Sequence, residues 1–142
     1  MKYLHKKDIC IDQLPGRGLR RAIGKQSEIE STTMTVGYAM YSSDYGIMEP
    51  HHHAEETVII TKAKDGWVSW GETKENLSNK IELRDDMILH FPENEWHVFT
   101  YGDGGYVEII FIYGSTDNLR PEDKQKEAES YVSNNERNLR SC

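Results

Sequence analysis

The stretch MEPHHHAEETVII, residues 48–60, places three consecutive histidines shortly before an apolar, β-branched run. Because side chains alternate between the two faces of a strand, His51 and His53 point to one face and His52 to the other. Glu55 and Glu56 follow closely. Neutral imidazole donates a lone pair to a metal ion, and a carboxylate offsets part of the metal charge. The stretch therefore fits half of a metal site, with a solvated polar loop as the alternative.

A third imidazole must come from elsewhere in the chain. His97, in FPENEWHVF (91–99), follows a proline-containing turn and opens a strand pattern, so its backbone is well fixed. His90 precedes that turn and His5 lies near the N-terminus, which makes both weaker candidates. The residues thus predict a site of three histidines, His51, His53 and His97, and one carboxylate. Three histidines plus water are the alternative.

Short strand patterns separated by polar turns recur along the chain. They occupy residues 34–41, 57–61, 67–71, 80–84, 87–91, 96–101 and 106–113, with a further possible strand in LRRAIG (19–24). The glycine-rich segment GDGG (102–105) predicts a hairpin between the last two. Strands that recur at this spacing without intervening helices predict an antiparallel sandwich or barrel.

The chain is expected to divide into three segments. Pro121, the acidic residues after it and the apolar spacing that follows predict a helix over 121–132. The segments are an N-terminal extension with the first strands (1–33), a barrel core (34–114) and a polar C-terminal tail (115–142) that contains this helix.

The composition of the chain limits the classes of partner that it is expected to bind. The chain has 142 residues, a mass of 16.4 kDa and a net charge of −7, which fits one domain with a sizeable core. Nucleic acids and anionic membrane surfaces bind clustered Lys and Arg, so neither is an expected partner. No apolar run approaches the roughly 20 residues that span a bilayer.

The location follows from the N-terminus and the cysteines. No apolar leader follows the N-terminal charges. Cys10 and Cys142 are not expected to form a disulfide, because Cys142 is the last residue of the sequence and chain ends are usually loose. We therefore expect a cytoplasmic protein.

The histidine-rich stretch resembles the first motif of the cupin superfamily. That motif runs glycine, five residues, His-x-His, three or four residues, Glu, six residues and glycine. This chain has Gly46, His51-x-His53, Glu56 and then Ala63 in the position of the last glycine.

The second stretch resembles the second cupin motif, which runs glycine, five residues, Pro-x-Gly, two residues, His, three residues and Asn. Here Asp86 stands in the first glycine position, Pro92 and His97 match in register, Asn94 replaces the second glycine, and Tyr101 stands in the Asn position. Asp and Asn tolerate turn conformations better than other non-glycine residues, so both exchanges are mild. The resemblance covers about residues 34–113.

The first motif departs from the family pattern in its spacing. Gly46 lies one residue too close to His51, and two residues separate His53 from Glu56 where the family has at least three. Six residues lie between Glu56 and Ala63, as in the family motif, which selects Glu56 as the acidic ligand. Glu55, or no carboxylate at all, is the alternative.

The resemblance implies a single antiparallel double-stranded β-helix, the jelly-roll barrel of cupins, here with a short C-terminal helix. It also implies one divalent first-row metal ion (Fe, Mn, Ni, Co or Zn) bound by His51, His53, Glu56 and His97. The expected function is that of a small metal-dependent enzyme. Its substrate would be an oxygen-rich small molecule, such as a sugar, sugar acid, hydroxyacid or diketone. The reaction would be isomerisation, lyase chemistry or O₂-dependent cleavage.

A non-enzymatic ligand- or sugar-binding module is the alternative function, because the fold does not select among these activities. An enzyme needs a base near the metal, and Glu108 and Tyr101 are the candidate catalytic residues. A homodimer is expected, with the early strands or the C-terminal helix at the interface.

Several other polar and aromatic residues can be interpreted as functional or as structural. Arg17, Arg20 and Arg21 could clamp an anionic substrate over the barrel mouth, or form a solvated surface. His52 is expected at the surface or beside the site rather than among the ligands. The larger aromatic residues are expected in the barrel core or pocket wall; they are Trp67, Trp70, Trp96, Phe99 and Phe111.

Overall fold

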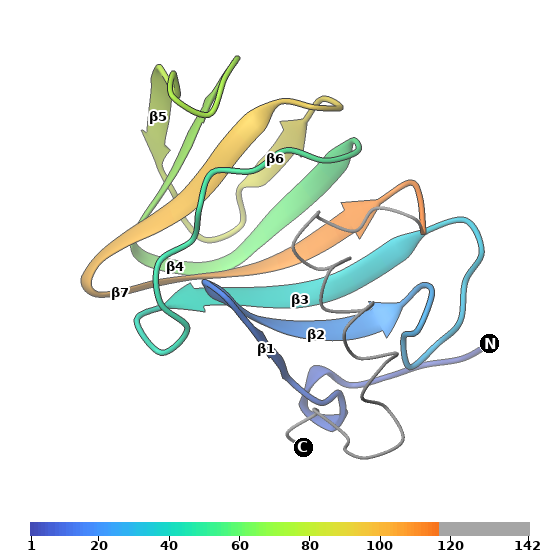
Figure 1. Cartoon of the computed structure of the whole chain (residues 1–142). Helices are drawn as coiled ribbons and strands as arrows, with labels where there is room; N and C mark the ends of the chain where they lie inside the picture. The colour runs from blue at the N-terminus through green and yellow to red at the C-terminus, as the bar shows by residue number, and fades with distance from the viewer. Residues whose placement is uncertain (117–142) are drawn as a thin grey trace, which may run out of the picture.

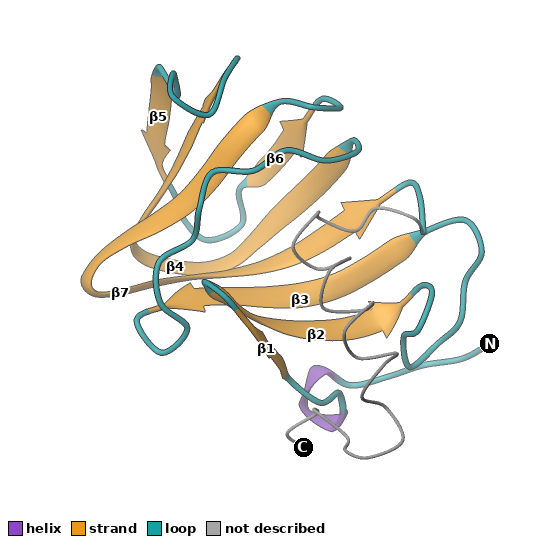
Figure 2. Cartoon of the chain, in the orientation of Figure 1, coloured by secondary structure: helices purple, strands orange, loops and turns teal. Residues whose placement is uncertain are grey.

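The computed structural model describes residues 1–116, so the helix predicted at 121–132 lies outside the described residues. The chain forms antiparallel strands joined by loops, with one short 3₁₀ turn near the N-terminus (Figure 2). The elements are η1 (Lys6–Asp8), β1 (Asp12–Leu14), β2 (Arg17–Ile23), β3 (Thr35–Ser42), β4 (Glu56–Gly71), β5 (Asn79–Glu82), β6 (Ile88–Phe91) and β7 (Trp96–Tyr113). The LRRAIG strand is confirmed as part of β2.

The strands are hydrogen-bonded in the order β1-β2-β3-β7-β4-β5, and β6 also pairs with β4. The two longest strands, β4 and β7, bend together, so that each contributes to both walls of the barrel (Figure 1). One wall holds β1, β2, β3, β6 and the halves of β4 and β7 that pair with them; the other holds β5 and the remaining halves. This is an antiparallel jelly roll, and it confirms the predicted all-β double-stranded β-helix.

The polar turn expected between the strand patterns 57–61 and 67–71 is wrong, and so is the hairpin predicted at 102–105. Residues 62–66 and 102–105 lie inside the continuous strands β4 and β7 rather than at chain reversals. Lys64 pairs with Tyr106 and Gly66 with Tyr101, so four residues of β7 lie opposite Asp65. Such a bulge bends the strand. The glycine-rich segment therefore lets β7 follow the bend of β4 instead of forming a hairpin.

The core lies between the two walls, where alternate residues of each strand point inward. Along β7, Val107, Ile109 and Phe111 are buried, whereas the residues between them are half exposed. From the opposite wall, Phe99 stacks on Tyr41 of β3 with ring centroids 4.8 Å apart. Apolar side chains from the two walls thus meet across the barrel.

The N-terminal segment packs on the outside of this barrel. Cys10 is disulfide-bonded, so the expectation that it is free is wrong; Cys142 lies outside the described residues. The cysteine argument for a reducing compartment loses its support, and the cytoplasmic location stays a prediction. Among residues 1–116, no helix is long and apolar enough to cross a membrane.

Candidate metal centre

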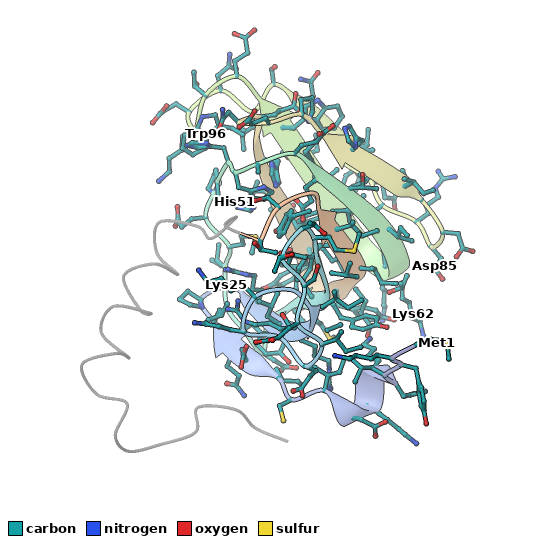
Figure 3. The ribbon with its side chains drawn as sticks, turned by 90° about the vertical axis from the view of Figure 1, so that its right-hand side faces the viewer. Met1, Lys25, His51, Lys62, Asp85 and Trp96 are labelled. Atoms are coloured by element: carbon teal, nitrogen blue, oxygen red, sulfur yellow. The ribbon has the colours of Figure 1, made fainter. Side chains whose placement is uncertain are left out.

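His51, His53 and His97 come together between the walls, as their spacing predicts. One ligand atom from each ring lies within 4.8 Å of the others, and the three residues are 7%, 8% and 1% exposed. The backbones of His51 and His97 pair reciprocally, with N–H to carbonyl distances of 3.0 and 2.9 Å. His51 is labelled in Figure 3, on the segment between β3 and β4. This pairing fixes the first histidine segment against the start of β7.

The backbone also sets which ring nitrogen of each histidine can bind a metal ion. Because a carbonyl oxygen only accepts hydrogen bonds, a ring nitrogen beside it must carry the proton and leave the lone pair on the other nitrogen. Each Nδ1 lies beside such an oxygen: His51 with Glu49 at 3.0 Å, His53 with Ala54 at 2.8 Å, and His97 with Glu95 at 2.9 Å. In each ring the lone pair is thereby assigned to Nε2, and the Nε2 atoms of His53 and His97 both lie near Glu56.

Two of these nitrogens are buried and unsatisfied. Among the described residues, the Nε2 atoms of His53 and His97 have no aligned hydrogen-bond partner. Buried polar atoms without a partner are rare, and a bound metal ion is one of the explanations they admit. The donor set of neutral imidazoles with an adjacent carboxylate suits a divalent first-row transition metal.

Glu56, rather than Glu55, supplies the adjacent carboxylate. Glu56 is 3% exposed, and its Oε2 lies 3.2 Å from Nε2 of His53 and 3.6 Å from Nε2 of His97. Glu55 points to the outer surface, where its Oε1 lies 2.8 Å from Nε2 of His90. The short spacing after His53 therefore still brings a carboxylate to the histidines, because β4 begins at Glu56 with its side chain inward.

The carboxyl group of Glu56 is strongly acidic in this setting. Burial alone raises its pKa, but the adjacent rings of His53 and His97 outweigh the burial and lower the pKa from 4.5 to about 2. Glu56 is therefore an anion at neutral pH, as a metal ligand must be.

Acid is expected to destabilise the metal-free protein through Glu56. The carboxyl has a pKa of about 2 when folded and 4.5 as a model group. The ionised carboxylate therefore contributes on the order of 3 kcal/mol to the free energy of unfolding. This contribution is fully present above pH 4.5 and is lost as the pH falls toward about 2. Urea unfolding of chelator-treated wild type and Glu56→Gln, from about pH 6 to about pH 2, isolates it as the difference. Parallel pH profiles for the two proteins would contradict this assignment.

Aromatic rings pack against the histidines from the barrel interior. Phe91 stacks on His97 with ring centroids 4.0 Å apart, and Tyr113 meets His53 edge to face at 5.1 Å. Phe111 continues this wall, 5.3 Å from Tyr113. Tyr113 was missed as a site residue, although the alternation along residues 107–113 places it on the inner face. A phenol and two apolar rings thus border the cluster.

The two residues predicted to be catalytic do not join the histidines. Glu108 lies on the outer face of β7, where its Oε2 is 3.3 Å from Nζ of Lys6. The Tyr101 hydroxyl donates a hydrogen bond to the carbonyl of Gly46 at 2.8 Å, and partial burial, followed by the charge of Asp44, raises its pKa. The structure thus gives Glu108 an outer ion pair and Tyr101 a loop contact, and it corrects their placement beside the metal.

His52 lies away from the cluster, as strand alternation predicts. Its ring packs against Trp96, with centroids 4.4 Å apart. Trp70 lies opposite His97 in the pairing of β4 and β7 and packs at the edge of the core.

No family model and no curated protein matches this chain. Solved structures do resemble it. The polyketide cyclase RemF from Streptomyces resistomycificus has 20% identity and a TM-score of 0.67, covering 85% of this chain and 82% of that one. A protein from Planctomyces limnophilus has 13% identity and a TM-score of 0.64, with coverages of 82% and 91%.

A third similar structure is oxalate decarboxylase from Lactobacillus farciminis. It has 10% identity and a TM-score of 0.62, and the match covers 92% of this chain and 39% of that one. Similarity at these identities defines the fold alone. Together with the jelly-roll topology and the buried histidine triad, it shows that this chain has the cupin fold.

Proposed function

We propose that the chain is a metal-dependent enzyme in which His51, His53, His97 and Glu56 hold one divalent first-row metal ion. The observation that carries this proposal is the orientation of the rings: each Nδ1 faces a backbone carbonyl, which leaves the Nε2 lone pairs for a metal ion. A merely structural histidine cluster has no need for this shared arrangement. Fe, Mn, Ni, Co and Zn all suit the donor set.

The substrate we propose is an oxygen-rich small molecule with two adjacent oxygens. A metal ion with open coordination positions supplies a Lewis acid for such oxygens, and a redox-active one also supports O₂ chemistry. Isomerisation, lyase chemistry and O₂-dependent cleavage all fall within this range. The similar structures named as a cyclase, a decarboxylase and DMSP lyases support small-molecule chemistry on this fold.

The residues around the histidines suit such a reaction. Phe91 stacks on His97, and Phe111 extends this apolar side through its contact with Tyr113. Tyr113 takes the place of Glu108 and Tyr101 as our candidate for proton transfer, because its ring lies against a ligand. We also propose that the chain forms a homodimer, with the early strands at the interface.

Elemental analysis of untagged, gently purified protein tests the proposal first. We expect about one equivalent of a first-row metal per chain. Metal identity then directs the assays: iron to O₂ uptake with diketones and catechols, and manganese, nickel, cobalt or zinc to isomerisation of sugars and uronates. Metal bound without turnover of any substrate class would favour a binding module. Failure to bind any of these ions after incubation would refute the proposed function.

A further inference from the structure

The inner face of β2 carries charged side chains next to the apolar core. Leu19 is buried and pairs with Ala39, which is also buried, so this face of β2 points into the barrel. Arg21 is two residues along and shares that face. Arg20 points the other way, where its guanidinium donates to the carbonyls of Lys6 and Ile9 in the N-terminal segment.

Arg21 forms an ion pair with Asp12. Its Nε donates to Oδ2 of Asp12 at 2.9 Å, with the two side chains 23% and 20% exposed. This is the one hydrogen bond that the Arg21 side chain makes among residues 1–116. A guanidinium has five N–H donors, so both Nη groups remain for a ligand within the part of the chain that the structure describes. A partly exposed ion pair contributes little to stability, and stability alone does not explain an arginine on this wall.

A continuous wall connects Arg21 to the histidines. Arg21 pairs with Gly37 of β3, and the ring of Phe111 covers Gly37 so closely that a Cβ there would overlap it. Phe111 contacts Tyr113, and Tyr113 contacts His53. From β2 to β4 this path crosses three strand spacings, about 14 Å along the curved sheet.

The charge of this wall opposes that of the whole chain. The protein has a net charge of −7, yet the inner face of β2 presents two arginines, Arg17 and Arg21, beside Asp12. Arg17 is 4% exposed and donates to the carbonyl of Pro15 at 3.5 Å. Arginine on a low-dielectric wall attracts anions and binds carboxylates through its planar fork.

We propose that Arg21 binds a carboxylate of the substrate, whose adjacent oxygens bind at the metal ion. This inference rests on the proposed function and narrows its substrate class. The substrate is a small organic acid with chelating oxygens at one end and a carboxylate at the other. Its body lies along Phe111 and Tyr113. Asp12 orients the guanidinium, and the carboxylate takes the two Nη groups.

Calorimetry with zinc-loaded full-length protein at low salt tests this with two acid–ester pairs. The probes are protocatechuate, dihydrocaffeate and the methyl ester of each, which share the chelating oxygens and differ in charge. We expect the acid to bind about tenfold more tightly than its ester in at least one pair, the scale of a charge-assisted hydrogen bond. In Arg21→Gln that ratio falls to about one, while ester binding stays unchanged.

Arg20→Gln is the matched control, because Arg20 is the neighbouring arginine on the outer face; it keeps the wild-type ratio. Arg21→Lys retains the charge without the fork and is expected to show an intermediate ratio, so the test does not depend on the folding of Arg21→Gln. Equal binding of acid and ester by wild type, or an unchanged ratio in both Arg21 variants, would overturn the carboxylate proposal alone. Binding of neither acid nor ester by zinc-loaded protein would overturn the proposed function with it.

Discussion

His97→Ala is expected to reduce bound metal from about one equivalent per chain to a small residual fraction, and to weaken metal binding by more than about a hundredfold. Loss of a residue that only orients a ligand typically costs 10–100-fold in affinity, and His97 is a ligand in our proposal. Its Nε2 is buried without a hydrogen-bond partner among the described residues, and Nδ1 is fixed by the carbonyl of Glu95. Equilibrium dialysis against zinc or manganese, followed by elemental analysis, measures the change.

His90→Ala is the matched control. The His90 side chain is 52% exposed and pairs with Glu55 on the outer surface, so its loss is expected to leave metal content and affinity unchanged. His97→Gln guards against misfolding, because it removes the imidazole and keeps more of the buried volume. Wild-type metal binding by folded His97 variants, or equal losses in His90→Ala, would remove His97 from the site.

The position of the histidines could be predicted from the sequence because it depends on strand alternation alone. His51 and His53 are two residues apart, so they share a face whatever the details of the fold. His97 follows a turn in which Asn94 adopts φ = 65°, a conformation that asparagine tolerates better than most residues. Strand alternation and local turn preferences were therefore enough to predict the three histidines. Choosing between Glu55 and Glu56 required knowledge of the residue at which β4 begins.

The bend of β4 and β7 could not be predicted, because its local signal is that of a turn. A segment such as GDGG permits both a chain reversal and a bulge. The outcome depends on the partner strand: Lys64, Asp65 and Gly66 lie against this segment and continue the sheet through it. The long-range pairing of β4 with β7 decides between a chain reversal and a bulge. A single sequence does not show that pairing.

The misplacement of Glu108 follows from the same bend. Four residues, an even number, separate Tyr101 from Tyr106 in β7, so the inward set that includes His97 and Phe99 continues at Val107 and Ile109. Glu108 is an odd number of residues from His97 and therefore faces outward. Treating residues 96–113 as one strand would have excluded it and selected Tyr113. Because a hairpin was predicted at 102–105, residues 96–113 were not treated as one strand with a single alternation.

Phe91→Ala is expected to lower the free energy of unfolding of the metal-free protein by about 3–5 kcal/mol, the usual cost of truncating a buried phenylalanine. Phe91 is 4% exposed, stacks on His97 at 4.0 Å and meets Phe99 edge to face at 6.2 Å. Total stabilities of about 5–15 kcal/mol make this a large fraction of the whole. Urea unfolding in the presence of a chelator measures it.

Ile88→Ala separates packing from strand propensity, because Ile88 lies on the same strand and is 71% exposed. Its truncation is expected to cost less than about 0.5 kcal/mol. The cost in Phe91→Ala should be partly recovered when zinc is added, since a ligand that binds only the folded chain stabilises it by mass action. The recovery should be smaller than in wild type, because the His97 ring has lost its stacking partner and is less well oriented. An equal gain from zinc in both proteins would mean that backbone contacts alone hold His97 in place, and that the aromatic wall belongs to the core rather than to the metal centre.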